Sequence, residues 1–196
     1  MQIIRFAELK AKPWRNGGGT TREILSGPAD QPADAPAGRP DSWGWRISLA
    51  DVTKAGDFSA FPGCERVLTV VEGDLLLLSV DGSERPVEKY RPFRFDGGAP
   101  TIAALPTGDI RNLNVITRSD AFKGYASVIE ISKKRAHPVF AGQVAVLLQG
   151  QATVGDGAGG SAELARYDAV VGSDDATPEV TGRGFLAVVS IDPAAD

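Results

Sequence analysis

The stretches LTVVEGDLLLL (residues 68–78) and VAVLLQGQATV (residues 144–154) share one pattern, and this pattern decides the fold. Each begins with an apolar run that ends near a glycine, and a second strand-like run follows at once. Short β-branched or alternating runs bounded by Gly, Pro or Asp are typical of β-strands joined by turns. The two stretches therefore predict the same strand–turn–strand element in two halves of the chain.

The residues that follow each stretch extend the likeness. Gly73 precedes Tyr90 by 17 residues (90 − 73), and Gly150 precedes Tyr167 by 17 residues (167 − 150). In both halves a hairpin lies between the glycine and the tyrosine, and another strand follows the tyrosine. Self-similarity at a fixed spacing indicates an internal duplication.

The remaining chain also predicts strands, with 23 Gly and 13 Pro residues favouring turns over long helices. Only GPADQPADAPAGRPD (residues 27–41) has the composition of a flexible excursion. The repeated core resembles that of cupins, in which a double-stranded β-helix closes around a pocket. We therefore expect an all-β bicupin with few or no long helices. Residues 1–120 would form one barrel, with the ligand pocket, and residues 121–196 a second, degenerate one. This division allows strands to be exchanged between the two halves.

Composition excludes several classes of function. The formal charge is −4, with no basic stripe of the kind that nucleic-acid binders carry. The apolar runs are too short to span a bilayer, and the charged N-terminal stretch does not resemble a signal peptide. A single cysteine is compatible with a reducing compartment. We expect a cytoplasmic monomer or homodimer that contacts neither nucleic acid nor membrane.

Metal-dependent and nucleophilic chemistry lack the residues that they need. Cupin metal sites gather two or three histidines and a carboxylate, but this chain has one histidine, His137, between the two halves. Cys64 is the only thiol, and no histidine partner or nucleophile motif accompanies it. We expect no metal, no cofactor and no established catalytic residue, with Glu23 as a weak candidate for a base.

The glycine run in PWRNGGGTTREI (residues 13–24) does not fit a nucleotide motif. It lacks the lysine of a phosphate-binding loop, and a strand pattern follows it where a helix would be needed. Consecutive glycines can instead present several bare N–H groups to an anion. We interpret the run as a strand-linking loop that forms one wall of a pocket.

Two strands place polar residues in alternation with apolar ones. Arg46, Ser48 and Ala50 share one face of WGWRISLADV (residues 43–52), and Asn112 and Asn114 share one face of RNLNVITR (residues 111–118). Asn is disfavoured in strands, and Arg is the natural partner of a carboxylate because it can donate two parallel hydrogen bonds. Solvent exposure is the simpler interpretation, and a polar pocket is the functional one.

These motifs together resemble the HutD/Ves family. The resemblance rests on PWRNGGGTTREI, on WGWRISLADV with FSAFPGCERV (residues 58–67), and on FRFDGG (residues 93–98) with GDIRNLNVITR (residues 108–118). It implies a bicupin without metal-binding histidines, associated with histidine utilisation, that binds an intermediate such as N-formylglutamate. One departure is Asn112, where the family commonly has an acidic residue.

The resemblance and the alternation together define a candidate ligand site in the first half. Its predicted members are Trp14, Asn16, Gly17, Gly18, Thr20, Glu23, Arg46, Ser48, Phe61, Arg66, Phe93, Asn112 and Asn114. The first hypothesis is a regulatory protein that binds a small carboxylate metabolite. The alternatives are a metal-free isomerase or hydrolase that acts on a small carboxylate, and a structural protein whose polar residues satisfy one another.

Overall fold

The computed structural model describes residues 1–28 and 43–194 of the chain. Within that part the chain forms seventeen strands and a single three-residue 3-10 helix, η1 (Phe6–Glu8). The all-β prediction is therefore confirmed. The expected flexible excursion over residues 27–41 lies almost entirely outside the described residues.

The chain divides into two compact units. The first unit comprises Lys10–Tyr125 together with the residues from Asp192 onward, and the second comprises Met1–Leu9 and Ala126–Ile191. The N-terminal segment thus packs with the C-terminal half of the chain and not with the residues that follow it directly. The sequence pattern placed the boundary near residue 120 and allowed strands to be exchanged between the halves, but it did not indicate which segment is exchanged.

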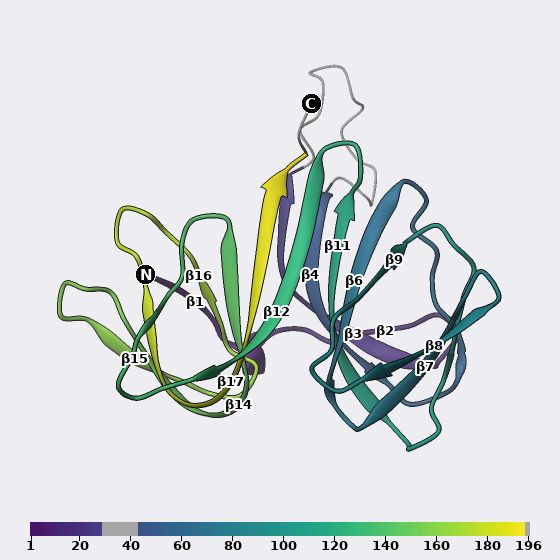
Figure 1. Ribbon diagram of the computed structural model, residues 1–196, viewed down its shortest axis with the longest axis horizontal. Coiled ribbons are helices and arrows are strands. Elements are labelled where there is room, and N and C mark those ends of the chain that lie inside the picture. The colour runs from purple at the N-terminus through teal and green to yellow at the C-terminus, as the bar shows by residue number, and fades with distance from the viewer. Residues whose placement is uncertain (29–42, 195–196) are drawn as a thin grey trace. The chain divides into compact units, whose positions relative to one another are not determined.

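The first unit holds two antiparallel sheets (Figure 1). The six-stranded sheet has the order β2 (Lys12–Pro13), β3 (Gly19–Pro28), β4 (Trp43–Val52), β11 (Ile110–Arg118), β6 (Cys64–Glu72) and β9 (Phe93–Asp96). The four-stranded sheet has the order β5 (Gly56–Asp57), β10 (Thr101–Ala104), β7 (Leu75–Val80) and β8 (Ser83–Glu88).

Apolar side chains from both of these sheets form one core. Strands β4, β6, β9 and β11 contribute from the larger sheet, and β7, β8 and β10 from the smaller one. The buried members are Val52, Phe58, Leu68, Val70, Leu76, Leu78, Val87, Phe95, Ala103 and Ile110. Because each strand alternates its side chains between two faces, the inward positions pack here while their neighbours face away.

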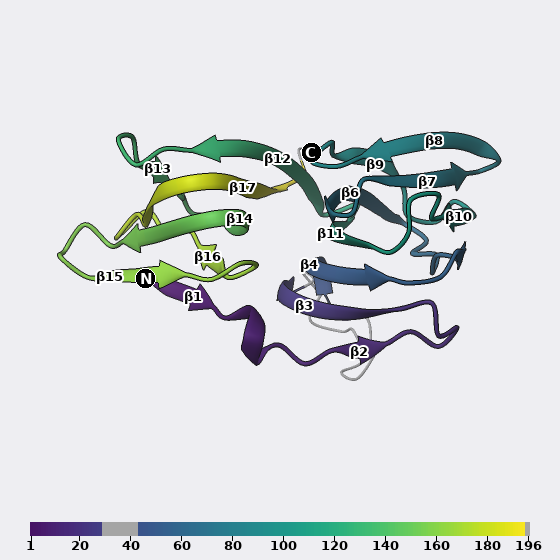
Figure 2. The same ribbon diagram turned by 90° about the horizontal axis from the view of Figure 1, so that it is seen from below.

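Most of the second unit is one antiparallel sheet (Figure 2). Its order is β1 (Gln2–Ile4), β16 (Ala169–Val171), β14 (Gln143–Gly155), β17 (Glu179–Pro193) and β12 (Phe122–Ile131), with β13 (His137–Pro138) paired to β17 and β15 (Ser161–Leu164) paired to β14. The N-terminal strand β1 pairs with β16, so that Ile3 lies opposite Val170.

The predicted repeat has the same backbone geometry in both units. Tyr90 and Tyr167 both adopt left-handed conformations, with φ of 64° and 70°. The Tyr90 N–H donates to the Val70 carbonyl at 2.8 Å, and the Tyr167 N–H donates to the Leu147 carbonyl at 2.6 Å. The separation is 20 residues in each case (90 − 70 and 167 − 147). The duplicated sequence therefore specifies one duplicated turn, an arrangement compatible with a bicupin.

His137 lies on the short strand β13, opposite Val180 of β17. Its Nε2 atom is buried and forms no hydrogen bond within the described residues. Burial disfavours the charged imidazolium, and it lowers the pKa of His137 from its ordinary value of 6.5.

We expect His137 to make stability pH-dependent on the acid side. Because its folded pKa is lowered, the folded state binds fewer protons than the unfolded state below about pH 6.5. The free energy of unfolding should thus fall from pH 7 to pH 5 and be insensitive to this group above pH 7. Denaturant titrations should show a shallower fall in the H137Q variant. Equal pH dependence in the two proteins would contradict the prediction.

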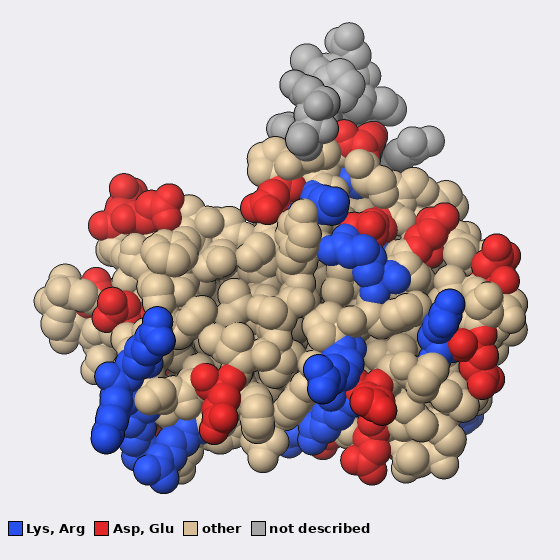
Figure 3. Space-filling model, viewed as in Figure 1, with Lys and Arg blue, Asp and Glu red and all other residues tan. Residues whose placement is uncertain are grey.

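No helix in the described part of the chain is long and apolar enough to cross a membrane. On the face that Figure 3 shows, Lys and Arg side chains and Asp and Glu side chains both occur in small groups separated by uncharged surface.

Candidate functional site

A cavity of about 520 Å³ lies in the first unit, and strands β3, β4, β6 and β11 form one of its walls. Neighbouring strands place Arg46, Ile116 and Arg66 in one row, because Ile116 pairs with Arg46 on β4 and with Arg66 on β6. All three residues line the cavity. Two guanidinium groups from strands that are distant in sequence thus reach one site.

The next rows of the same sheet continue this wall. Ser48 pairs with Glu23 on β3 and with Asn114 on β11, and Ala50 pairs with Thr21 on β3. All five residues line the cavity. The alternation in residues 43–52 thus places the even-numbered residues from Arg46 to Ala50 on the face of β4 that lines the cavity.

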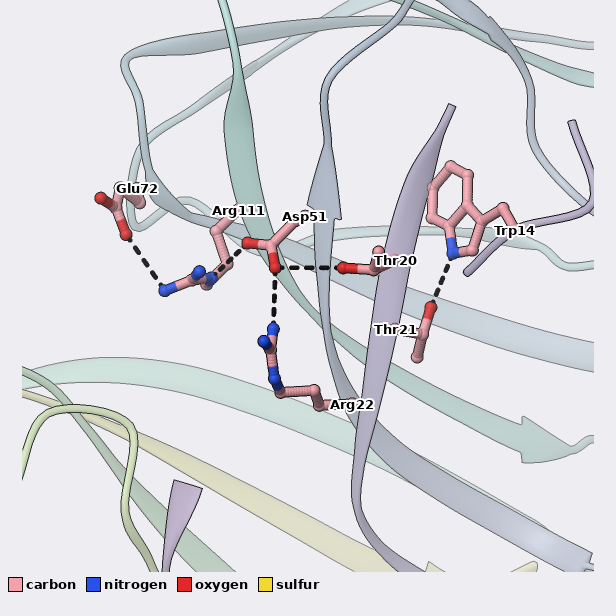
Figure 4. A network of polar contacts seen from close by, with 7 residues as sticks. All are labelled: Trp14, Thr20, Thr21, Arg22, Asp51, Glu72 and Arg111. Carbon is pink, nitrogen blue, oxygen red and sulfur yellow. Dashed lines mark hydrogen bonds and ion pairs between the residues drawn. The ribbon is translucent and has the colours of Figure 1, made fainter. Parts of the chain in front are cut away.

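Aromatic rings cover much of the remaining surface. Trp14, Phe58 and Phe61 line the cavity. The rings of Trp14 and Phe58 meet edge to face at 5.6 Å between centroids. The Trp14 Nε1–H donates to Thr21 Oγ1 at 2.7 Å (Figure 4), which fixes the indole against β3. These rings exclude water from the polar groups beneath them.

Arg66 is the most deeply buried cation of the site, with only 5% of its surface exposed. Its guanidinium carbon lies 5.4, 5.6 and 5.1 Å from the ring centroids of Phe58, Phe61 and Phe95. Its Nη2 donates to Asn114 Oδ1 at 2.8 Å, and its Nη1 donates to the Ser59 carbonyl at 3.4 Å. These acceptors are neutral.

No carboxylate within the described residues forms an ion pair with Arg66, and its buried Nε has no hydrogen-bond partner there. Burial, and secondarily the charge of Arg46, lower the pKa of Arg66 to about 10. The guanidinium is therefore still protonated at neutral pH. A buried cation without a counter-charge is costly, and a bound anion would offset that cost.

Arg46 lies beside Arg66 and shares one of its aromatic contacts. Its guanidinium carbon is 4.9 Å from the Trp43 ring centroid and 5.3 Å from that of Phe61. Phe61 is therefore flanked by both guanidinium groups. Cation–π contacts of this kind hold the two cations in place despite their mutual repulsion.

The charges that line the cavity are unbalanced. Among the described residues that line it, four are cations (Lys12, Arg15, Arg46 and Arg66) and two are carboxylates (Glu23 and Asp57), a formal charge of 4 − 2 = +2. The whole chain carries −4. This local excess of positive charge attracts anions to a protein that is otherwise acidic.

Asn112 supports the site from beneath and does not line it. Its side chain is completely buried, and its Oδ1 accepts a hydrogen bond from Asn114 Nδ2. Asn114 Oδ1 in turn accepts from Arg66. The two amides thus orient Arg66, while Asn112 Nδ2 has no partner in the described part of the chain.

The glycine run does not form the predicted anion-binding nest. The Gly17 N–H donates to the Trp14 carbonyl at 3.1 Å, and the Gly18 N–H donates to Asn16 Oδ1 at 3.0 Å. These amides hold the loop itself, and neither glycine lines the cavity. Asn16 does line it, and its Nδ2 donates to the Asp57 carbonyl at 3.2 Å.

Gly19 is the glycine of this run that the packing requires. A Cβ there would lie 2.1 Å from the Asp51 carbonyl oxygen, whereas a Cβ on Gly18 would lie 3.2 Å from the movable Asn16 side chain. We expect G19A to lower the free energy of unfolding by about 1–3 kcal/mol, as overpacking does. G18A should cost less than half as much in the same denaturant titration. Equal losses would contradict this assignment.

Thr20 lies on the opposite face of β3 and belongs to a separate polar network (Figure 4). Asp51 is the centre of this network. It accepts from Thr20 Oγ1 at 3.3 Å, from Arg22 at 3.0 Å and from Arg111 Nε at 2.6 Å. Arg111 also pairs with Glu72. Thr20, one of the predicted site residues, does not line the cavity, because alternation turns it away from the face that Thr21 and Glu23 share.

Phe93 also lies outside the cavity. It packs against the core of the first unit and stacks on Phe95 at 5.6 Å. Phe95, two residues further along β9, pairs with Arg66 and contacts its guanidinium. Of the predicted residues, the cavity brings together Trp14, Asn16, Glu23, Arg46, Ser48, Phe61, Arg66 and Asn114.

Several residues that line the cavity are not among those predicted from the sequence. Thr21 could have been found by extending the alternation from Glu23. Asp57 lies at the end of β5, where no local pattern marks it, whereas Phe58 and Ser59 begin the motif FSAFPGCERV and could have been included with Phe61. Among the described residues, no group of three His, Cys, Asp or Glu side chains is placed to hold a metal ion.

Comparison with solved structures defines the class of protein. The chain is similar to a cupin 2 conserved barrel domain protein from Leptotrichia buccalis, with a TM-score of 0.60, 9% identity and coverage of 97% of this chain and 96% of that one. It is more similar to a conserved protein of unknown function from Pseudomonas aeruginosa PAO1 (TM-score 0.78, 25% identity, 99% of each chain). The fold is therefore that of cupins.

The chain belongs to the HutD family, whose sequence model matches residues 6–188. HutD from Pseudomonas fluorescens SBW25 has a similar structure, with a TM-score of 0.76, 28% identity and coverage of 99% of each chain. Two curated relatives match over shorter stretches. They are an uncharacterised protein of the hutC 3′ region in Pseudomonas putida (38% identity, 59% of this chain) and protein Ves of Citrobacter koseri (35% identity, 66% of this chain). The matches span 57% and 64% of those two relatives.

Proposed function

We propose that the first unit binds a small carboxylate metabolite in the cavity beside Arg66. The observation that carries this proposal is the burial of Arg66 among three phenylalanine rings, where both of its hydrogen-bond acceptors in the described part of the chain are neutral. The volume of about 520 Å³ is in the range of metabolite pockets. The net positive lining supports an anion over a neutral ligand.

Membership of the HutD family suggests the source of the ligand. The names of the family and of the hutC-region relative point to histidine utilisation. We propose N-formylglutamate, or a related intermediate of histidine degradation, as the ligand, and control of flux through that pathway as the role. In this proposal the protein binds the ligand and controls the pathway in the cytoplasm.

Calorimetry on the whole chain tests this proposal. Formate, glutamate, N-formylglutamate and urocanate would be titrated at neutral pH, with formate chosen as the simplest carboxylate. Saturable binding of at least one organic acid at submillimolar concentration is expected. Absence of binding by all four at millimolar concentration would overturn the proposal.

A metal-free enzyme is the second candidate, and the position of Glu23 favours it. Glu23 lines the cavity and forms no ion pair with Arg22 or Arg46 within the described residues. It could therefore act as a base toward a carboxylate substrate. Product formation during incubation with the same acids, followed by NMR and lost in the E23Q variant, would favour this candidate over simple binding.

A further inference from the structure

Glu23 and Arg66 lie at opposite ends of the polar wall. Glu23 is on β3 and Arg66 on β6, and β4 and β11 lie between these strands. Three strand spacings of about 4.8 Å place the two backbones about 14 Å apart across the sheet. Their side chains both face the cavity and bridge part of this distance. The remaining space suits a molecule with two different polar ends.

The two ends differ in charge and in hydrogen-bonding capacity. Arg66 offers only donors. Glu23 offers only acceptors when ionised, and Ser26 Oγ occupies just one of its oxygens, Oε1, at 2.9 Å. A carboxylate bound near Glu23 would be repelled, whereas an N–H group would be attracted. The cavity therefore discriminates between the two ends of a ligand.

Ser48 and Asn114 connect the two ends. They occupy the row that begins with Glu23, and Asn114 also contacts Arg66. Ser48 is 2% exposed and Asn114 is 5% exposed, so both are held in a fixed environment. The Ser48 hydroxyl and the Asn114 amide lie between the Arg66 cation and the Glu23 carboxylate, where they can hydrogen-bond the middle of a short ligand.

We propose that Glu23 is a specificity-determining residue that selects a carboxylate ligand bearing a nitrogen donor. The ligand is an amino-acid derivative whose carboxylate lies toward Arg66 and whose N–H group, a protonated amine or an amide, lies toward Glu23. This inference rests on the proposed carboxylate binding. It adds a requirement that an anion site alone does not impose.

Three probes with one carbon skeleton separate these properties. Glutarate has no nitrogen, N-formylglutamate has an amide N–H, and glutamate has a protonated amine. Calorimetry would compare the wild-type chain with E23Q, and with E84Q as the matched control. Glu84 lies exposed on β8 and does not line the cavity.

The effect of E23Q should depend on the probe. Glutamate should lose about tenfold or more in affinity, because the glutamine oxygen can still accept a hydrogen bond from the ammonium group but no longer carries the charge that strengthens it. N-formylglutamate should lose about three- to tenfold, and glutarate should bind unchanged or more tightly because a repulsive charge is gone. E84Q should leave all three affinities unchanged. Thermal unfolding would verify that both variants fold.

Two results would overturn the inference while leaving carboxylate binding intact. One is the same change, or no change, for all three probes in E23Q. The other is binding of glutarate to the wild-type chain without binding of either nitrogen-bearing probe. Failure of all three to bind the wild-type chain would overturn this inference, and the proposed function would be overturned with it only if formate and urocanate also fail to bind.

Discussion

Replacing Arg66 with methionine should abolish carboxylate binding. Methionine fills much of the same space among Phe58, Phe61 and Phe95 but has no charge and no donor. Truncating one member of a desolvated ion pair costs about 2–5 kcal/mol, which corresponds to a loss of about 30-fold to several-thousand-fold in affinity. Calorimetry with whichever acid binds the wild-type chain measures this loss directly.

The same substitution should not destabilise the ligand-free protein. Arg66 is buried without a counter-charge in the described structure, and an apolar side chain of similar volume avoids the desolvation cost of its guanidinium. We therefore expect an equal or higher melting temperature for ligand-free R66M and no further increase when the acid is added. A residue that served only stability would show the opposite result.

The exposed Arg85 on β8 provides the matched control. R85M removes the same charge from the same unit but leaves the cavity lining unchanged. It should bind the acid with wild-type affinity and keep the ligand-induced rise in melting temperature. Loss of binding in R85M as well as in R66M would show that net charge, and not the buried guanidinium, determines the affinity.

The sequence predicts those parts of the site that depend on local periodicity. Alternation along β4 assigns Arg46 and Ser48 to one face, and the sheet then places that face against the cavity. The same rule would have rejected Thr20, which is adjacent to Thr21 and so must point the other way. The family motif includes Thr20, but its position on the strand turns its side chain away from the cavity.

The parts that the sequence does not predict depend on pairings between distant segments. Phe58 reaches Arg66 because β5 pairs with β10 and not with its neighbour in sequence. The Gly17 and Gly18 N–H groups donate to the Trp14 carbonyl and to the Asn16 side chain. The number of glycines in a loop does not reveal such hydrogen bonds. The motifs draw attention to this loop, but the hydrogen bonds of its amides depend on how the loop folds back on Trp14 and Asn16.

The duplicated turn has diverged in a way that explains the position of the N-terminal segment. After Tyr90 the chain continues with Arg91, whereas after Tyr167 it continues with Asp168. Asp168 is 2% exposed and accepts hydrogen bonds from Arg5 Nη1 at 2.6 Å, from the Phe6 N–H at 2.9 Å and from the Ala165 N–H at 3.0 Å. One carboxylate thus fastens the N-terminal segment to the second unit.

Replacing Asp168 with alanine should therefore strongly destabilise the second unit. It removes the acceptor of three hydrogen bonds and leaves Arg5 without its carboxylate. Because the Arg5 side chain is 36% exposed, part of this loss is recovered by solvation. We expect the free energy of unfolding to fall by about 2–4 kcal/mol in denaturant titrations.

The loss should be localised as well as large. Strand β1 pairs only with β16 within the described structure, so that its amides should exchange with solvent much faster in D168A, while those of β14 and β17 keep their relative protection. D175A, which removes an exposed carboxylate of the same unit, should change neither stability nor exchange. Uniform loss of protection across the sheet would instead show that Asp168 supports the whole unit, and that the N-terminal segment is held by its apolar contacts.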